Sequence, residues 1–338
     1  MRIAIDAMGG DRGPAVNVEG ASLALNEWPE IEKLYLVGDK SEIKAQLNSR
    51  ALDKDKIEIV HSSEIVEMNE SPAMAIRKKK KSSISIATEL VKSGDCAAIV
   101  SAGNTGAAVA AATLKLRNIE GVDRAGIASP MPNEYGTCYL VDAGANTEAK
   151  PFHLLQYAVM GSVYAKEVNG KPSPKVGLMS NGSEDEKGSI FTKKVFSLLK
   201  DSSLNFVGNI EGNDLFSSEL DVVVCDGFTG NIVLKACEAT AKAVAKWVKE
   251  EMLKSPLSKL GAQLVKPAFK AAMSRGSYEE YGGSLLLGVN GVCIIAHGGS
   301  SAIAIKNAIR VASQSIRQKL NPHIESEIQK LNFHSTDN

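Results

Sequence analysis

Polar side chains follow short apolar runs at five places in this chain, each time next to glycine. The five turns are Asp6–Asp11, Ser101–Ala108, Asp142–Asn146, Ser180–Gly188 and Cys225–Asn231. In an α/β protein, side chains at the carboxyl ends of parallel strands point into the ligand crevice, and glycine lets the backbone approach a ligand closely. Because the strand ends of such a sheet share one edge, we expect the five turns to build one active site.

The second turn carries the clearest signal for an anion. Gly103, Asn104, Thr105 and Gly106 lie between an apolar run and an alanine-rich helical stretch. Asn104 or Thr105 can cap that helix, and the free N–H groups at its start favour a bound anion. An ordinary capped turn has the same residues, so both interpretations stay open here.

The remaining turns supply further groups for binding a substrate, none of them specific when taken alone, since Asp, Asn and Gly also favour turns for local reasons. These candidate binding residues are Asp6, Gly9, Gly10, Asp11, Asp142, Asn146, Asp226, Gly227, Gly230 and Asn231.

Three residues are candidates for catalysis. His297 ends the apolar run at 292–296 and is followed by two glycines and two serines, a setting that the other four histidines lack. Asn181 can donate a hydrogen bond, and Lys187 can neutralise charge, although a solvated lysine at the start of a helix is an equal alternative.

Several familiar motifs are missing. The chain has no GxxxxGK[ST] loop, no GxGxxG fingerprint, no GxSxG elbow and no HExxH pair. Its five cysteines include no CxxC pair, so we expect no zinc site. The turns therefore favour a small anion held by backbone amides, with no cofactor and no metal.

Composition sets broad limits. The 338 residues carry 39 basic and 39 acidic side chains, so no bulk charge favours nucleic acid. No run of about 18 apolar residues is present, so we expect no membrane span. Scattered cysteines are typical of a reducing cytoplasm.

Apolar runs alternate with helical patterns along the chain, which predicts a three-layer α/β/α fold with a mostly parallel sheet. Strands are expected at 2–6, 33–37, 57–60, 96–100, 124–129, 137–142, 175–179, 204–208, 221–225 and 292–296. Helices are expected at 14–26, 84–93, 105–116, 152–167, 189–199 and 229–253. The short turn at 131–134 predicts a hairpin, so the sheet should be mixed.

We expect one large α/β domain over 1–338, with 171–174 as an alternative seam between two lobes. A helical hairpin is expected to protrude near 250–275, where Pro267 should break or bend the helix. Leu257, Leu260 and Leu264 fall on one face of this stretch, which fits an interfacial membrane anchor or, equally, a core or dimer helix.

A second surface feature is the basic run 77–81, Arg-Lys-Lys-Lys-Lys. Such runs are most often simply solvated. The alternative is a dock for an acidic partner protein.

These residues resemble the phosphate acyltransferase family of bacterial phospholipid synthesis, PlsX. The resemblance extends over nearly the whole chain in order, and also includes the segments 36–39 and 281–283. At Arg12 the chain departs from the family pattern, in which a histidine often follows the second acid, so a general base at this position is in doubt.

The resemblance implies transfer of a fatty acyl group from acyl carrier protein to inorganic phosphate. It also implies a fold similar to isopropylmalate dehydrogenases and phosphotransacetylases, and a homodimer. The enzyme would be cytoplasmic and reversibly attached to the inner membrane face, where a membrane-bound glycerol-3-phosphate acyltransferase would take the product. In this scheme the 103–106 turn holds phosphate and His297 protonates the leaving group or donates to the oxyanion. Asp6, Asp11 and Asp226 orient donors.

Two alternatives remain at this point. One is an NAD-dependent decarboxylating dehydrogenase on a similar fold, which would need nucleotide contacts and a carboxylate cluster for a metal. The other is a sensor of acyl chains or phosphate that has no catalytic activity.

Overall fold

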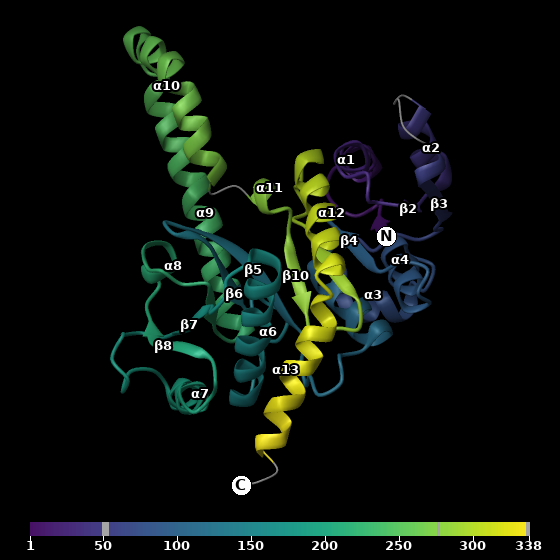
Figure 1. The fold of residues 1–338 in the computed structure, drawn as a ribbon. Coiled ribbons are helices and arrows are strands. Elements are labelled where there is room, and N and C mark those ends of the chain that lie inside the picture. The colour runs from purple at the N-terminus through teal and green to yellow at the C-terminus, as the bar shows by residue number, and fades with distance from the viewer. Residues whose placement is uncertain (49–53, 276–277, 336–338) are drawn as a thin grey trace.

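A single twisted sheet runs through the whole molecule. The computed structural model describes residues 1–48, 54–275 and 278–335, and in this part of the chain the sheet has eleven strands in the order β3-β2-β1-β4-β11-β10-β5-β6-β9-β7-β8 (Figure 1). The strands are β1 (Arg2–Asp6), β2 (Lys33–Gly38), β3 (Ile57–His61), β4 (Ala98–Ser101), β5 (Gly126–Asn133), β6 (Gly136–Val141), β7 (Lys175–Met179), β8 (Asn205–Ile210), β9 (Val222–Val224), β10 (Ser284–Leu287) and β11 (Val292–Ile295).

Helices cover both faces of the sheet. They are α1 (Gly13–Glu27), α2 (Lys40–Asn48), α3 (Pro72–Lys78), α4 (Ser83–Lys92), α5 (Thr105–Ala111), α6 (Pro151–Asn169), α7 (Ile190–Lys200), α8 (Asp214–Ser217), α9 (Gly227–Met252), α10 (Pro256–Arg275), α11 (Tyr278–Tyr281), α12 (Ala302–Arg317) and α13 (Leu320–Ser335). A 3₁₀ turn (Lys54–Lys56) precedes β3, and a π-helical turn (Ala112–Leu116) continues α5.

The alternation of side chains along the strands divides the core into two layers. Helices α1, α6, α12 and α13 pack on one face, against residues such as Ile5, Val100 and Val141. Helices α3, α4 and α5 pack on the other face, where α8 and α9 also lie. The predicted three-layer α/β/α fold is therefore confirmed. Each of the ten predicted strands overlaps an observed one, whereas β10 was not predicted.

The predicted hairpin is present and reverses the direction of half the sheet. β5 and β6 pair antiparallel with their turn at 134–135, and β10 lies antiparallel between β11 and β5. β6, β9, β7 and β8 therefore run opposite to β1, β4 and β11. The expectation that all five turns share one edge is wrong, because Asp142 and Asp226 leave strands that point the other way.

The two sets of strands nevertheless end at one level of the sheet. The pairing registers place one residue from each of the eight strands from β1 to β7 in the sheet order in a single row, namely Ile5, Val100, Ile294, Leu285, Ala128, Val141, Val224 and Leu178. Asp6 and Ser101 follow this row in one direction, and Asp142 follows it in the other. The turns therefore meet along a line across the sheet.

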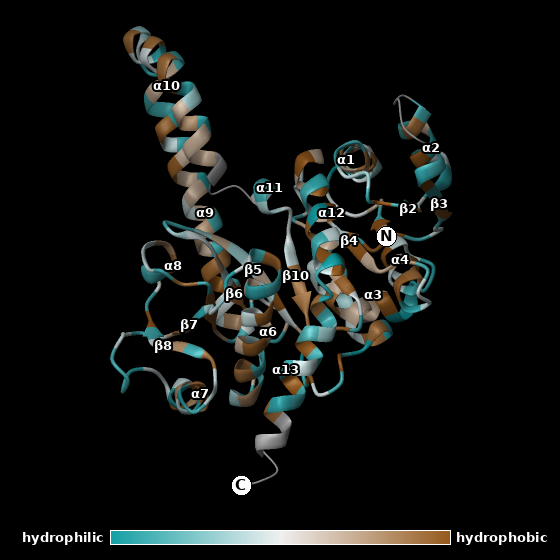
Figure 2. Ribbon diagram, in the orientation of Figure 1, coloured by the Kyte–Doolittle hydropathy of each residue, from teal (hydrophilic) through white to brown (hydrophobic). Residues whose placement is uncertain are grey.

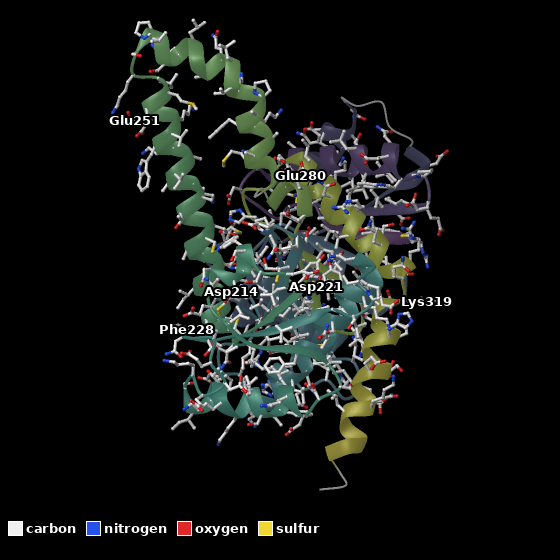
Figure 3. All side chains as sticks on the ribbon, turned by 60° about the vertical axis from the view of Figure 1, so that its left-hand side comes forward. Asp214, Asp221, Phe228, Glu251, Glu280 and Lys319 are labelled. Atoms are coloured by element: carbon white, nitrogen blue, oxygen red, sulfur yellow. The ribbon has the colours of Figure 1, made fainter. Side chains whose placement is uncertain are left out.

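Helices α9 and α10 form an arm that projects from the body of the protein (Figures 1 and 3). Of the residues of α9, all of which are described, only Gly227 and Gly230 are buried. The reversal lies at 253–255, and α10 continues through Pro267. Of the break or bend predicted at Pro267, the break is wrong, because solvent can satisfy the one carbonyl whose hydrogen bond the proline removes from this exposed helix. The bend stays a prediction. No described helix is both long and apolar enough to span a bilayer.

Candidate active site

The first turn packs directly against the turn after β4. Ser101 Oγ donates a 2.7 Å hydrogen bond to Asp6 Oδ2, and both side chains are buried. A Cβ atom on Gly9 would lie 2.7 Å from the Gly103 nitrogen, so only glycine allows this backbone approach. Burial raises the pKa of Asp6, although the nearby hydroxyls of Ser83 and Ser101 oppose the rise.

The turn after β11 completes this group. The Asp11 N–H donates to the Gly298 carbonyl at 2.8 Å, and Gly10 has a φ of +94° that favours glycine. His297 is half-buried, and its Nδ1 accepts the N–H of Gly299 at 3.0 Å. A neutral His297 ring therefore carries its proton on Nε2.

Asn104, one of the two predicted capping residues, caps α5, and its amide nitrogen already donates within the protein. Oδ1 accepts the Ala107 N–H at 3.0 Å, and Nδ2 donates to the Met68 carbonyl at 2.9 Å. By contrast, the N–H groups of Thr105 and Gly106 donate to no group of the described residues. Any anion at this turn would therefore bind to backbone rather than to the Asn104 amide.

Asp142 is the centre of a second, separate group. Its Oδ1 accepts the N–H groups of Ile127, Gly144 and Ala145 at 2.9–3.0 Å, and its Oδ2 accepts that of Asn146 at 2.7 Å. The side chain is fully buried, which raises its pKa while the four N–H donors oppose the rise. Asp142 thus holds its own loop in shape and offers no open oxygen to a substrate.

The start of α9 packs onto this loop. A Cβ atom on Gly230 would lie 1.9 Å from the Asp142 carbonyl oxygen, and one on Gly227 would lie 2.6 Å from the Asn146 carbonyl oxygen. Asp226 caps the helix by accepting the Thr229 N–H at 2.9 Å. Asn231 lies beside Gly144 with its side chain exposed.

The fourth turn, Ser180–Gly188, stands apart from both groups. Asn181 and Lys187 are exposed, and the aliphatic part of Lys187 packs beside Gly182. The buried Asn209 side chain donates to the Glu184 carbonyl of this turn at 2.8 Å. No hydrogen bond or ion pair in the described chain joins Asn181 or Lys187 to His297.

The structure therefore brings most of the predicted residues together in two groups and leaves Asn181 and Lys187 outside both. One group contains Asp6, Gly9, Gly10, Asp11, Gly103, Asn104, Thr105, Gly106 and His297; a second contains Asp142, Asn146, Asp226, Gly227, Gly230 and Asn231. The two meet through one hydrophobic cluster, in which Ala107 and Ala108 of α5 belong together with Ala143. Among the described residues, no three His, Cys, Asp or Glu side chains gather where they could hold a metal.

Two structural residues of the site were not predicted. Asn17 is buried in α1, and its Nδ2 donates to the carbonyls of Ala7 and Gly9 at 2.9 Å, which fixes the first turn. The sequence signal for this role was an amide side chain among the apolar residues on the buried face of α1. The other residue is Lys79, whose Nζ contacts the Ile65 carbonyl and the Glu70 carboxylate, both at 2.7 Å.

Comparison with known proteins places the chain in a family. A family model described as "Fatty acid synthesis protein" matches residues 1–322. A phosphate acyltransferase of Akkermansia muciniphila is 55% identical over 337 residues, covering 98% of this chain and 97% of the relative. A phosphate acyltransferase of Pelotomaculum thermopropionicum is 51% identical over 331 residues, covering 98% and 96%. The chain belongs to this family. The predicted family and the predicted enzyme class, an acyltransferase, are confirmed.

Solved structures confirm the fold at much lower identity. A phosphotransacetylase from Streptococcus pyogenes aligns with a TM-score of 0.62 at 17% identity, covering 94% of each chain. The EutD phosphotransacetylase from Staphylococcus aureus aligns at 0.58 and 15%, covering 93% of this chain and 94% of that one. The predicted likeness to phosphotransacetylases is thus confirmed for the fold, whereas that to isopropylmalate dehydrogenases stays a prediction.

Proposed function

We propose that this protein transfers a fatty acyl group from acyl carrier protein to inorganic phosphate and releases acyl phosphate. The observation that carries the proposal is the match along nearly the whole chain to relatives named phosphate acyltransferase. The dehydrogenase alternative gains no support from these relatives.

The first group of turns supports a mechanism that needs no activated nucleophile. Phosphate is already nucleophilic at neutral pH, so the site has to orient it toward the thioester carbonyl. The N–H groups of Thr105 and Gly106 would bind its oxygens. A phosphate oxygen then attacks the carbonyl carbon, and the carbon–sulfur bond breaks as the tetrahedral oxyanion collapses. His297 would donate from Nε2 to the oxyanion or to the departing thiolate.

A direct assay tests the reaction. Acyl carrier protein thioester and phosphate should yield acyl phosphate and free thiol in equal amounts, and His297→Ala should lower kcat about 100-fold. Thiol release that does not depend on phosphate would indicate a thioesterase, and absence of turnover would favour a sensor. Near-normal turnover and phosphate KM in both His297→Ala and Asn104→Ala would show that the site lies elsewhere.

For the carrier protein we propose a dock on the basic run 77–81. Arg77, Lys78, Lys80 and Lys81 are exposed. Opposite charge on a partner would raise the association rate at low salt. Reversing Lys78 and Lys80 to glutamate should raise the KM for the carrier protein severalfold at low salt and leave the phosphate KM unchanged. An unaltered carrier KM would contradict the dock.

We also propose a homodimer formed through the arm. Helix α9 exposes Phe228, Ile232, Val244 and Trp247, with exposed fractions from 46% to 61%. Figure 2 shows that apolar and polar segments alternate along this helix. Figure 3 shows Phe228 near the start of this helix and Glu251 near its far end. An apolar surface of this length is typical of an interface. Trp247→Glu should shift the sedimenting species from dimer to monomer, and an unchanged sedimentation coefficient would exclude α9 from the interface.

At the end of the arm we propose reversible contact with the inner face of the cell membrane. Leu257, Leu260 and Leu264 of α10 are 80%, 58% and 76% exposed, and lysines lie on the same helix. Such contact would deliver a long-chain acyl phosphate to a membrane-bound glycerol-3-phosphate acyltransferase. Leu260→Glu should abolish flotation with anionic liposomes, whereas Gln263→Glu, which adds the same charge off the leucine stripe, should retain it. Equal flotation of both variants would rule out this anchor.

A further inference from the structure

The loop at 62–71 lies against the first group of turns and is fastened there by two side chains. It connects β3 to α3, and we refer to it as the 62–71 loop. Asn104 Nδ2 donates to the Met68 carbonyl at 2.9 Å and to the Glu70 carbonyl at 3.3 Å. The residue that caps the anion-binding turn therefore also holds this loop.

Lys79 is the second side chain that holds the 62–71 loop, and its contacts differ from those of the other residues of the basic run. Its Nζ donates to the Ile65 carbonyl at 2.7 Å and forms an ion pair with Glu70 at 2.7 Å. The Glu70 carboxylate also accepts the N–H of Glu67 at 3.1 Å. One lysine thus bridges both halves of the loop, whereas its neighbour Lys80 is exposed and has no partner in the described chain.

The loop brings an apolar side chain to the reacting end of the site. A Cβ atom on Gly298 would lie 2.9 Å from Met68 Cε, so the Met68 methyl group packs on the residue that follows His297. Met68 is nevertheless 48% exposed. A flexible, half-exposed thioether beside polar turns is suited to contact an aliphatic chain of variable length.

We propose that Met68 contacts the acyl chain next to the thioester carbonyl, and that Lys79 and Glu70 are positioning residues that hold it there. The proposal rests on the proposed function, since it says which side chain contacts the acyl chain of that reaction beside His297. It also separates Lys79 from the dock: Lys78 and Lys80 would act on encounter with the carrier protein, whereas Lys79 acts on the position of the substrate.

The test compares Lys79→Met with Lys44→Met, which removes the same charge from an exposed position of α2 outside both the site and the dock. Lys79→Met and Glu70→Gln should each lower kcat about tenfold, and the double variant should be no worse than Lys79→Met, because that substitution alone already removes the shared Lys79–Glu70 contact. Lys79→Arg should restore part of the rate, and Lys44→Met should keep the wild-type kcat. Hydrogen exchange of the 62–71 loop should rise in Lys79→Met and in Glu70→Gln, but not in Lys44→Met. Met68→Ala should change the ratio of kcat/KM between a short and a long acyl donor at least threefold.

Wild-type kcat in Lys79→Met, an equal loss of kcat in Lys44→Met, unchanged hydrogen exchange of the loop in Lys79→Met, or an unchanged chain-length ratio in Met68→Ala would each overturn the proposal. Failure of the proposed function is distinguishable, because it appears as a wild-type enzyme that forms no acyl phosphate.

Discussion

Asp6 and Asp142 occupy equivalent positions in sequence, since each follows a buried strand and precedes alanine, yet their surroundings differ. Asp142 accepts four backbone N–H groups with its two oxygens. Asp6 accepts one side-chain hydroxyl at Oδ2, and its Oδ1 accepts no hydrogen bond of ordinary geometry from the described residues. Both oxygens of the Asp142 carboxylate accept backbone hydrogen bonds, whereas one oxygen of the Asp6 carboxylate accepts none from the described residues.

The turns at Asp6 and Asp142 share a sequence pattern but have different tasks. The loop at Asp142 supports the start of α9. The turns around Asp6 leave the N–H groups of Thr105 and Gly106 without an acceptor in the described part of the chain, and they place His297 nearby. Chemistry is therefore expected on the side of Asp6, and stability on the side of Asp142.

The largest expected effect is at Asp142. Asp142→Ala would leave four buried N–H groups without an acceptor, and each such group costs about 1–3 kcal/mol. Since the loop can relax in part, we expect the free energy of unfolding to fall by about 4 kcal/mol. Urea denaturation measures this. A loss below about 1 kcal/mol would show that the loop does not depend on this carboxylate, and the contrast with Asp6 would disappear.

Two glycines sharpen the contrast. Gly230→Ala places a methyl group 1.9 Å from the Asp142 carbonyl oxygen, so we expect a loss of about 3 kcal/mol in stability. Gly9→Ala separates the Asp6 and Gly103 turns, so we expect at least a tenfold loss of kcat with a smaller loss of stability. Gly261→Ala in α10 is the control, because nothing lies within 4 Å of the added atom. If Gly9→Ala and Gly230→Ala lost stability and activity in the same proportion, the division of tasks would be wrong.

The sequence predicted most of the fold because hydrophobic periodicity reports burial directly. β10 escaped detection because Ser284–Leu287 is only four residues long and contains no β-branched residue. The direction of the second half of the sheet could have been predicted, since the hairpin at 131–134 already requires that the strand before Asp142 run opposite to its predecessor.

The site was predicted by residue type, and side-chain partners decided the roles. Asn104 is a residue type that can bind an anion, yet its amide nitrogen already donates to the carbonyls of Met68 and Glu70. Lys79 lies among four other basic residues and differs from them only by its contacts with Ile65 and Glu70. Such distinctions depend on contacts between segments far apart in the chain, which local patterns do not encode.

The smallest expected effect concerns the titration of Asp6. Burial raises its pKa in the folded protein, so the folded state retains the proton while the unfolded state, with a pKa of about 3.9, loses it. Stability from this group is therefore fully present below the unfolded pKa and is lost as pH rises through the folded pKa. Asp6→Asn cannot titrate, so its free energy of unfolding should rise relative to that of wild type between pH 4 and pH 7.

Urea denaturation across this pH range measures the slope of the free energy of unfolding against pH. This slope is independent of any constant cost of the asparagine amide. Ser101→Ala is the matched variant of opposite sign. It removes the 2.7 Å hydrogen bond that favours the charged carboxylate, so its stability should fall more steeply with pH than that of wild type. Parallel curves for all three proteins would mean that Asp6 does not titrate differently in the folded state, and the Asp6 oxygen that accepts no hydrogen bond from the described residues would then have no electrostatic consequence.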